Sequence, residues 1–342
     1  MDDADGIVVL NSVAAPRPTT NPYNVMLIAA VRSQPATQLL DFSWPVALFG
    51  RYDAVHAHWP ETRIGGRPPM RAIRAVLFAA WIARLQSTRT AVVRTQHNLD
   101  EPQGLTRFEA GLLKRFQALT TEYIVLNPHT ALPTTAPSTV IPHGHYRDWY
   151  RDSSREERVA GRVVYFGMIR RYKGVEALID AFRGMPPDGD PALALVVAGR
   201  PSSPDHVEAL RRRAGDDHRI DLRFGYLETD ELVRLTTSAE LVVLPYRHMH
   251  NSGAILAALS LDTPVLAPDN DVTRALADEV GSGWVHRFTG DLSSHDLAAA
   301  LRAVRTRPPH PVPDLSAREW NEAGARHVEV FRSAIRRKRG DA

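Results

Sequence analysis

The sequence predicts an α/β protein made of two facing, doubly wound domains. Apolar runs of strand length alternate with helical patterns through most of the 342 residues, which is typical of βαβ units and parallel sheets. A polar, charged segment at 145–162 interrupts this alternation, and the same rhythm restarts after it. Because the chain is too long for one ordinary core, we interpret the interruption as a domain boundary.

Strand candidates occur in two sets, one on each side of the charged segment. They are expected at 6–10, 54–58, 91–96, 123–127 and 138–142, and then at 162–167, 193–199, 220–225, 239–245 and 263–268. Helical patterns lie between them at 23–33, 68–86 and 105–120, and from about Lys173, His206, Thr229 and Ser252. Ligands of open α/β sheets bind at the carboxyl ends of strands, so we expect the site in the cleft between the two sheets.

These patterns place the domains at 1–155 and 156–314. The region 315–342 follows the second domain and contains a helical pattern that ends in basic residues. We expect this last helix to pack partly against the first domain.

Composition excludes several classes of protein. The chain has no cysteine, which excludes disulfides, thiolate metal sites and a cysteine nucleophile. Its formal net charge of +3 is too small to argue for a nucleic-acid partner. The acidic N-terminus lacks the apolar core of a secretory signal. The sequence contains no apolar run of about 18 residues, the length needed to span a membrane. We therefore expect a cytoplasmic protein.

One lysine stands out in a chain that uses arginine for nearly all its positive charge. Only Lys114, Lys173 and Lys338 are lysines, and Lys173 lies between a buried strand and a helix, in a loop with Gly167, Arg170 and Arg171. A helix start with free N–H groups and nearby cations is an anion site. The alternative is a solvated cationic loop.

A second anion candidate follows a later strand, in "LPYRHMHNSGAILAALSLDTPVLAPDN" (244–270). Asn251, Ser252 and Gly253 directly precede a helical pattern, and His250 lies beside them. Ser252 can cap the helix, and Gly253 lets a ligand approach the backbone. A capped helix with surface histidines is the simpler explanation of this segment alone. Two cationic helix starts at strand ends together favour a diphosphate, while a G-x-G-x-x-G dinucleotide loop is absent from the sequence.

The order of these motifs resembles the GT-B glycosyltransferases, in particular the GT4-like group. The resemblance rests on "GMIRRYKGVEALIDAF", "VVAGR", "GYLETDEL", "AELVVLPY" and "DTPVLAP" in the second half, and on "YDAVHAHWPE", "VVRTQHN" and "VIPHGHY" in the first. It extends over nearly the whole chain and looks most like bacterial exopolysaccharide or glycolipid transferases. It implies two Rossmann-like domains, with the acceptor bound by the first and the nucleotide sugar by the second.

The resemblance also implies roles for matching residues. Lys173, with Arg170 or Arg171, would neutralise the leaving nucleoside diphosphate without a metal or other cofactor. Gly167, His250, Asn251, Ser252 and Gly253 would complete the phosphate site. Tyr226 and Leu227 would hold the base through backbone groups. His97 would face the donor sugar from the first domain, unless it is a buried histidine with a structural role.

Two departures from the group's pattern affect this interpretation. Met168 stands where many members carry a basic residue, so any arginine role moves to Arg170 or Arg171. The usual E-x7-E pair is replaced by Met249 and Ala257. Members of the group usually retain the anomeric configuration, but an inverting reaction stays open. An inverting reaction would need a base, for which Glu61, Asp100 and His97 are candidates.

On the acceptor side, we expect Asn21 and Tyr23 in the loop after the first strand, and Trp59 and Glu61 in "HWPETR" (58–63), to contact the acceptor. An aromatic face such as Trp59 suits a sugar ring, although core packing would also explain it. His56 and His58 have the spacing of a metal pair but lack a third ligand in the sequence nearby, so we expect no metal.

The segment 67–89 predicts a basic amphipathic helix in which arginines accompany Leu77, Phe78, Trp81 and Ile82. This pattern suits a membrane interface, and a helix that covers the sheet would look similar. If the acceptor is lipid-linked, such a helix would attach the protein to the inner face of the plasma membrane.

These observations predict a metal-independent, retaining glycosyltransferase that moves a sugar from a nucleoside-diphosphate sugar to a glycolipid or polysaccharide. The resemblance alone suggests GDP-mannose as the donor. Two alternatives share the architecture: a sugar-nucleotide epimerase, which would need more carboxylates at the donor site, and a non-catalytic nucleotide-sugar-binding protein.

Overall fold

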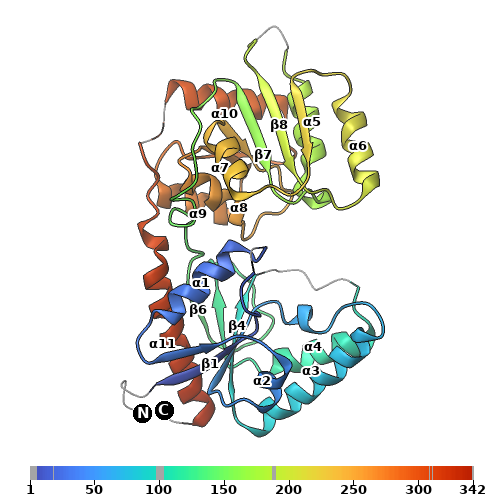
Figure 1. Ribbon diagram of the computed structural model, residues 1–342. Helices are drawn as coiled ribbons and strands as arrows, with labels where there is room; N and C mark the ends of the chain where they lie inside the picture. The colour runs from blue at the N-terminus through green and yellow to red at the C-terminus, as the bar shows by residue number, and fades with distance from the viewer. Residues whose placement is uncertain are drawn as a thin grey trace. The chain divides into compact units, whose positions relative to one another are not determined.

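A computed structural model describes residues 6–17, 19–97, 104–186, 190–307, 309 and 311–340. The chain divides into two compact units, residues 1–144 with 318–342, and residues 145–317 (Figure 1). The sequence interpretation places these boundaries near 155 and 314.

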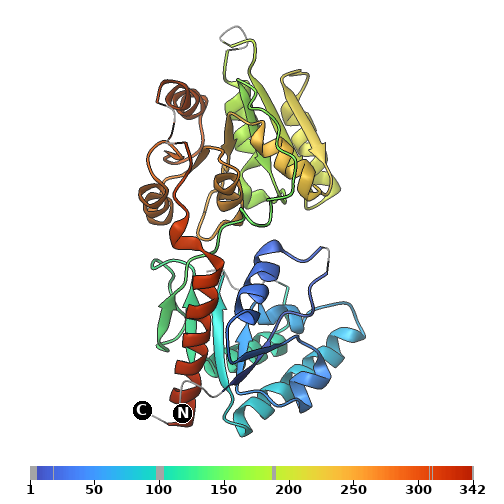
Figure 2. The ribbon, with the colours of Figure 1, turned by 60° about the vertical axis from the view of Figure 1, so that its left-hand side comes forward.

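The first unit contains a parallel six-stranded sheet in the order β2-β1-β3-β4-β5-β6. Its strands are β1 (Ile7–Asn11), β2 (Thr37–Leu40), β3 (Ala54–Ala57), β4 (Ala91–Gln96), β5 (Glu122–Val125) and β6 (Ser138–Val140). Its helices are α1 (Pro22–Arg32), α2 (Trp44–Phe49), α3 (Met70–Ser87), α4 (Arg107–Ala118) and α11 (Trp320–Arg339), with a 3₁₀ turn η1 (Pro60–Arg63). The last helix of the chain therefore completes the first unit, as Figure 2 shows.

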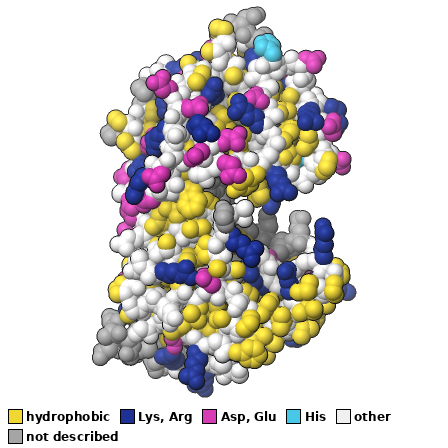
Figure 3. All heavy atoms as spheres, viewed as in Figure 1, with side chains coloured by type: hydrophobic (Ala, Val, Ile, Leu, Met, Phe, Trp, Pro, Cys, Tyr) yellow, Lys and Arg dark blue, Asp and Glu magenta, His cyan; other side chains and the backbone are white. Residues whose placement is uncertain are grey.

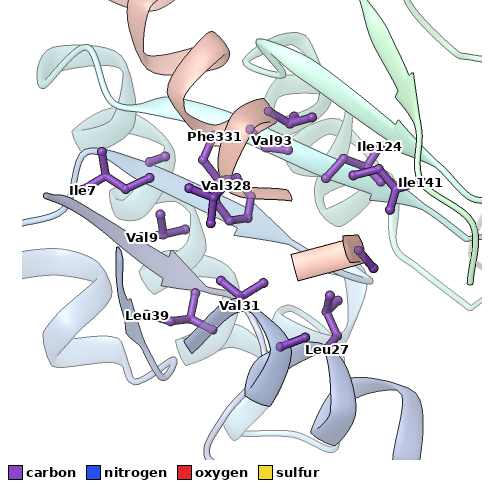
Figure 4. Close-up of a cluster of buried hydrophobic side chains, with 14 of the residues drawn as sticks. Ile7, Val9, Leu27, Val31, Leu39, Val93, Ile124, Ile141, Val328 and Phe331 are labelled. Atoms are coloured by element: carbon purple, nitrogen blue, oxygen red, sulfur yellow. The ribbon is translucent and has the colours of Figure 1, made fainter. Parts of the chain in front are cut away.

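Helices cover both faces of this sheet, and the strand residues alternate between them. Ile7 and Val9 of β1 pack with Val93 of β4 under α1 and α11 (Figure 4). Leu10 and Val92 pack on the other face, under α2, α3 and α4. Strands that are buried on both faces read as continuous apolar runs, which is why the sequence reveals them.

The second unit has the same architecture, with a parallel sheet in the order β12-β11-β10-β7-β8-β9. Its strands are β7 (Arg162–Phe166), β8 (Ala194–Gly199), β9 (Ile220–Phe224), β10 (Leu241–Val243), β11 (Val265–Pro268) and β12 (Val285–Phe288). Its helices are α5 (Val175–Arg183), α6 (Pro204–Ala214), α7 (Thr229–Thr237), α8 (Gly253–Ser260), α9 (Asp271–Val280) and α10 (Ser294–Thr306), with 3₁₀ turns η2 (Arg171–Lys173) and η3 (Ser316–Arg318).

The predicted fold class is confirmed, and every expected strand is present. Two edge strands, β2 and β12, were not expected. Their sequences, TQLL and VHRF, are short and half polar, because an edge strand needs only one buried flank.

One sequence interpretation of α3 is wrong. Phe78, Trp81 and Ile82 are buried against the sheet rather than presented to a membrane. Two of the accompanying arginines are held within the unit: Arg71 pairs with Glu109 of α4, and Arg84 donates to the Ala47 carbonyl at 2.9 Å. The face of α3 that carries Phe78, Trp81 and Ile82 covers the sheet, which is the alternative that the sequence left open.

Helix α11 approaches α1 closely at a glycine. A Cβ added to Gly324 would lie 2.4 Å from the Ala30 carbonyl oxygen, so a side chain there must separate the two helices. Gly324 is therefore a packing requirement of the first unit.

We predict that Gly324→Ala lowers the free energy of unfolding by about 1–3 kcal/mol, the usual cost of overpacking. Gly111→Ala in α4 is the matched control. Its added Cβ meets nothing within 4 Å, so it should stabilise the helix by roughly 0.5–1 kcal/mol. Chemical denaturation of both variants measures the difference, and equal stabilisation by the two alanines would contradict this view of the α1–α11 contact.

Candidate active site

The loop that carries Lys173 is shaped by two glycines. Gly167 follows β7 with φ 115°, and Gly174 has φ 66° at the point where η2 gives way to α5. A Cβ on Gly174 would lie 2.0 Å from the carbonyl oxygen of Pro245, so only glycine fits. This contact presses the loop after β7 against the loop after β10.

The two anion candidates predicted from the sequence lie side by side. Strands β7 and β10 are hydrogen-bonded neighbours, so their carboxyl ends open at the same edge of the sheet. The Arg247 N–H donates to the Tyr172 carbonyl at 3.1 Å and ties the two loops together. The sheet topology thus assembles one site from segments about 75 residues apart.

Lys173 lies between these loops. Its Nζ is 4.9 Å from the centre of the Tyr246 ring, and a Cβ added to Gly167 would lie 3.9 Å from the same nitrogen. Burial and the nearby positive charge of Arg170 lower the pKa of Lys173 to about 8. An anion bound at this amine would restore the favourable environment that a buried ammonium lacks.

Tyr246 supports the lysine and was missed by the sequence interpretation. It is only 5% exposed, and burial raises the pKa of its hydroxyl while nearby Ser252 opposes that rise. The buried hydroxyl makes no hydrogen bond to any described residue, so it is a donor that can serve a ligand. An aromatic residue directly after a buried strand was the only sequence signal.

The remaining donor-side residues differ in their placement. Arg170 and Arg171 are exposed at η2. Ser252 takes the N-cap position of α8, but its side chain makes no capping bond, so the first-turn N–H groups from Gly253 onward are not capped by it. His250 and Asn251 are half-buried in the same loop, whereas Tyr226 and Leu227 follow β9, two strands from β7.

The positions of the missing glutamate pair are part of the core. Met249 is 6% exposed and Ala257 is 5% exposed, and the Met249 carbonyl accepts a hydrogen bond from Asn270 at 2.9 Å. Apolar packing has replaced carboxylates at both positions.

The first unit holds a row of imidazoles at the carboxyl ends of β3 and β4, in which His56 and His58 are buried and His97 is half-buried. His58 Nδ1 lies 2.8 Å from His97 Nε2, and His58 Nε2 lies 3.3 Å from His56 Nδ1. His56 Nε2 in turn lies 2.8 Å from the Thr95 hydroxyl. The sequence interpretation considered His56 and His58 only as a metal pair and so missed their contact with His97.

Burial keeps these rings neutral. It lowers the pKa of His56 and His97 well below the ordinary value and that of His58 to about 3. His143 and His327, which lie nearby, have pKa values lowered to about 4 for the same reason. In the part of the chain that the structure describes, no three metal-ligating side chains form a metal site.

The predicted acceptor residues have local roles as well. The Asn21 side chain caps α1 by accepting from the Tyr23 N–H at 3.0 Å, and Tyr23 is a core residue 4.5 Å from the His143 ring. Trp59, at φ 43°, stacks on His97 with 3.8 Å between ring centres. Glu61 lines a hollow of about 350 Å³ with Arg71, and burial raises its pKa. Asp100, a candidate base, lies outside the described residues.

Comparison with known proteins identifies relatives of the whole chain. A family model of the glycosyl transferases group 1 matches residues 160–306. The chain is 40% identical over 340 residues to a GDP-mannose:glycolipid 4-beta-D-mannosyltransferase of Xanthomonas campestris pv. campestris, covering 99% of this chain and 95% of the relative.

Solved structures share the fold at low sequence identity. HepE of Anabaena, crystallised with UDP, has a TM-score of 0.61 and 14% identity over 98% of each chain. Sucrose-phosphate synthase of Thermosynechococcus elongatus has a TM-score of 0.56 and 14% identity over 96% of each chain.

We predict that acid destabilises the first unit through its buried histidines. Because their pKa values in the folded state lie below the unfolded value of about 6.5, the unfolded chain binds more protons as the pH falls from about 6.5 toward 4. Each such histidine removes up to about 1.4 kcal/mol per pH unit in that window, and stability is full above it. Denaturation from pH 7.5 to 5.0 measures the slope.

His327→Phe is the control for this prediction. His327 Nδ1 bonds the Ala323 carbonyl at 2.7 Å, and its buried Nε2 has no partner among the described residues. The variant should reduce the slope by about one histidine's share. A stability that does not change between pH 6.5 and 5.0 would show that these rings are not held neutral.

Proposed function

The chain belongs to the GT-B glycosyltransferases of group 1, and from this membership we propose that it transfers mannose from GDP-mannose to a glycolipid. The observation that carries the proposal is the identity of 40%, over nearly the full length of both chains, to a mannosyltransferase with that donor and acceptor class. The low-identity structural neighbours support the fold alone.

In this proposal the second unit binds the donor. Lys173 neutralises the charge that develops on the leaving diphosphate, with Arg170 and Arg171 close by at η2 and the uncapped start of α8 opposite. Fixed cations and N–H groups supply this stabilisation without a metal. Gly167 leaves room above the end of β7 for the phosphates, and Tyr226 with Leu227 is assigned to the base.

We propose inversion at the anomeric carbon in place of the retention expected from the group. The relative makes a β-mannoside, and GDP-mannose carries its sugar as the α anomer, so its reaction inverts that carbon. In such a step the acceptor oxygen bonds to C1 while the C1–O bond to the diphosphate breaks, and its electron pair leaves with GDP. A base must take the hydroxyl proton, and we assign this role to His97, which lies beside the partly exposed Trp59 ring.

The first unit then binds the acceptor. Trp59, stacked on His97, offers a partly exposed aromatic face beside the base, and Glu61 offers a carboxylate for sugar hydroxyls. Asn21 and Tyr23 order the start of α1 next to this cluster, since the Tyr23 ring lies 5.5 Å from that of His97.

A lipid-linked acceptor also requires access to a membrane. Among the described residues, every helix is too short or too polar to cross a bilayer. The outer face of α3 is apolar, however, and Figure 3 shows hydrophobic side chains gathered over this region. Exposed apolar residues there and at the adjoining helix ends are Phe49, Met70, Ile73, Val76 and Phe108.

Charge complements this apolar face. In α2, α3 and α4 the one carboxylate is Glu109, which is buried and paired with Arg71. Exposed cations Arg67, Arg107 and Lys114 lie on or beside the same helices. We therefore propose that this outer face of α3, rather than the buried one, contacts an anionic lipid surface at the cytoplasmic side.

We predict that Lys173→Ala lowers kcat by about 10²–10³-fold with GDP-mannose, the scale for loss of one electrostatic donor. Lys338→Ala, at the end of α11, should not change kcat.

In the wild type, GDP affinity should fall above about pH 8, where free Lys173 loses its proton, by up to tenfold per pH unit. Titration calorimetry at pH 7 to 9.5 measures this dependence. Near-normal turnover by the alanine variant would refute the leaving-group assignment.

We predict that Ile73→Asp with Val76→Asp lowers binding to vesicles containing anionic lipid by at least about tenfold, since each apolar side chain contributes roughly 1.5–3 kcal/mol when fully buried. Cosedimentation with anionic and with zwitterionic vesicles measures the effect. Turnover with a water-soluble acceptor should be unchanged. Ala275→Asp with Ser282→Asp, at exposed positions of the second unit, adds the same two negative charges and is the control that should bind vesicles as the wild type does.

A further inference from the structure

We propose that His58 and His56 are positioning residues that set the tautomer of His97 through a hydrogen-bonded relay ending at Thr95. The inference rests on the proposed function, because it concerns the base of that reaction. It is carried by the three side-chain contacts in series, at 2.8, 3.3 and 2.8 Å, between His97, His58, His56 and Thr95.

The strands and their hydrogen bonds fix the positions of the relay side chains. His56 belongs to β3, Thr95 belongs to β4, and the two strands are parallel neighbours. Ser12, directly after β1, holds the His58 backbone from both sides: its hydroxyl accepts from the His58 N–H at 2.7 Å and donates to the His58 carbonyl at 3.0 Å. Both relay histidines are 2% exposed, so the rings have little freedom to turn.

Counting hydrogens gives the relay a single direction. A neutral imidazole has one N–H and one lone pair, so a ring bonded through both nitrogens must donate at one and accept at the other. His58 and His56 are both bonded in this way. Once one bond has a direction, every bond in the row has the same direction.

Only one of the two directions places the His97 lone pair outside the relay, as the proposed base requires. If His97 Nε2–H donates to His58 Nδ1, His58 donates to His56 and His56 donates to Thr95, the lone pair of His97 lies on Nδ1, outside the relay. In the reverse direction His97 carries its hydrogen on Nδ1, and its lone pair on Nε2 is already used by His58. The direction of the relay therefore decides which nitrogen of His97 carries the lone pair.

A row of imidazoles also suits a base that must be neutral before the reaction. A carboxylate partner on Nε2 would raise the pKa of His97 and favour the protonated ring, whereas neutral His58 accepts the same N–H without doing so. Once His97 has taken the acceptor proton, its bond to His58 Nδ1 becomes charge-assisted and stronger. The partner thus stabilises the product of proton transfer more than the resting base.

Other polar side chains surround the relay without belonging to it. His143 donates from Nδ1 to the Gly144 carbonyl, and His327 donates from Nδ1 to the Ala323 carbonyl, each at 2.7 Å. Both rings, and Arg94, oppose positive charge on His97. Tyr23 packs edge-on against His97 and is neutral at ordinary pH because burial raises its pKa.

The tautomer itself can be measured in the folded protein. In protein with ¹⁵N-labelled histidine, the ring nitrogens of His97, assigned with a His97→Gln variant, should show the hydrogen on Nε2 at pH 7.5. His58→Phe should move that hydrogen partly to Nδ1. A wild-type His97 protonated on Nδ1 would overturn the proposal whatever the variants do.

Kinetics separate positioning from a structural role. We expect His58→Phe to lower kcat by about 10²-fold, within the range for general base catalysis, with KM for GDP-mannose within about twofold. His58→Asn keeps an acceptor near Nδ1 and should recover at least about tenfold. His58→Asp should move the acidic limb of the kcat–pH profile to higher pH. His327→Phe, equally buried beside His56 but outside the relay, should leave kcat within about twofold and move the acidic limb less than His58→Asp does, since it removes only one ring that opposes positive charge on His97.

Two results would overturn the relay: a His58→Phe kcat within about twofold of the wild type, or an equal loss in His327→Phe. Failure of the proposed function looks different. If the wild type transfers no mannose, or if His97→Gln retains full turnover, the base assignment fails, while the nitrogen spectra still report the direction of the relay.

Discussion

The parallel pairing of neighbouring strands is the constraint on which both candidate sites depend. Strands that run in the same direction end at the same edge, so residues just beyond their carboxyl ends meet although they are far apart in sequence. In the first unit, β3 and β4 bring His58 to His97. In the second, β7 and β10 bring Lys173 to Tyr246. The helices that cover the faces make these edges rigid.

Each site then holds ionisable groups where water is scarce, with opposite consequences for charge. Burial lowers the pKa of Lys173 to about 8, so an anion bound beside this amine would favour its charged form. Burial lowers the pKa of His97 and His58, so these imidazoles are neutral at ordinary pH and hold a protonated state less readily. The same physical effect, desolvation, thus lowers the pKa of the amine in one unit and of the imidazoles in the other.

The alternation of strand and helix patterns was enough to predict the fold, because both sheets are covered on both faces and their strands are continuously apolar. It missed β2 and β12, which lie at sheet edges and carry polar residues. The placement of Lys173 and Ser252 just beyond strand ends could be predicted, since basic residues and a possible N-cap follow apolar runs directly, although Ser252 makes no capping bond. The relay could not, because H-x-H spacing shows that His56 and His58 share a face without showing which neighbour supplies the third ring.

The face of α3 illustrates a different limit. Helical periodicity correctly indicated that the segment is amphipathic, but the larger aromatic side chains belong to the core and the smaller stripe of Ile73 and Val76 is exposed. Size decides this, because burying Phe78 and Trp81 removes more apolar surface from water than burying the other face would. A sequence pattern reports that a helix has two faces, and only the packing shows which one the sheet takes.

Structural similarity supports the fold of this chain, and sequence similarity supports its chemistry. The loss of the glutamate pair shows why the two inferences must be made separately. Structures at 14% identity share the two-sheet architecture, yet an architecture accommodates many donors and either stereochemical course. Met249 and Ala257 are packed into the core, so the ribose contact assigned to the group cannot be carried over. The role proposed for Lys173 concerns the phosphates rather than the ribose, so the loss of the two glutamates does not affect that assignment. A chain can therefore keep the leaving-group site of its group while changing how the sugar is attacked, and a neutral imidazole held by its neighbours is a means of doing so.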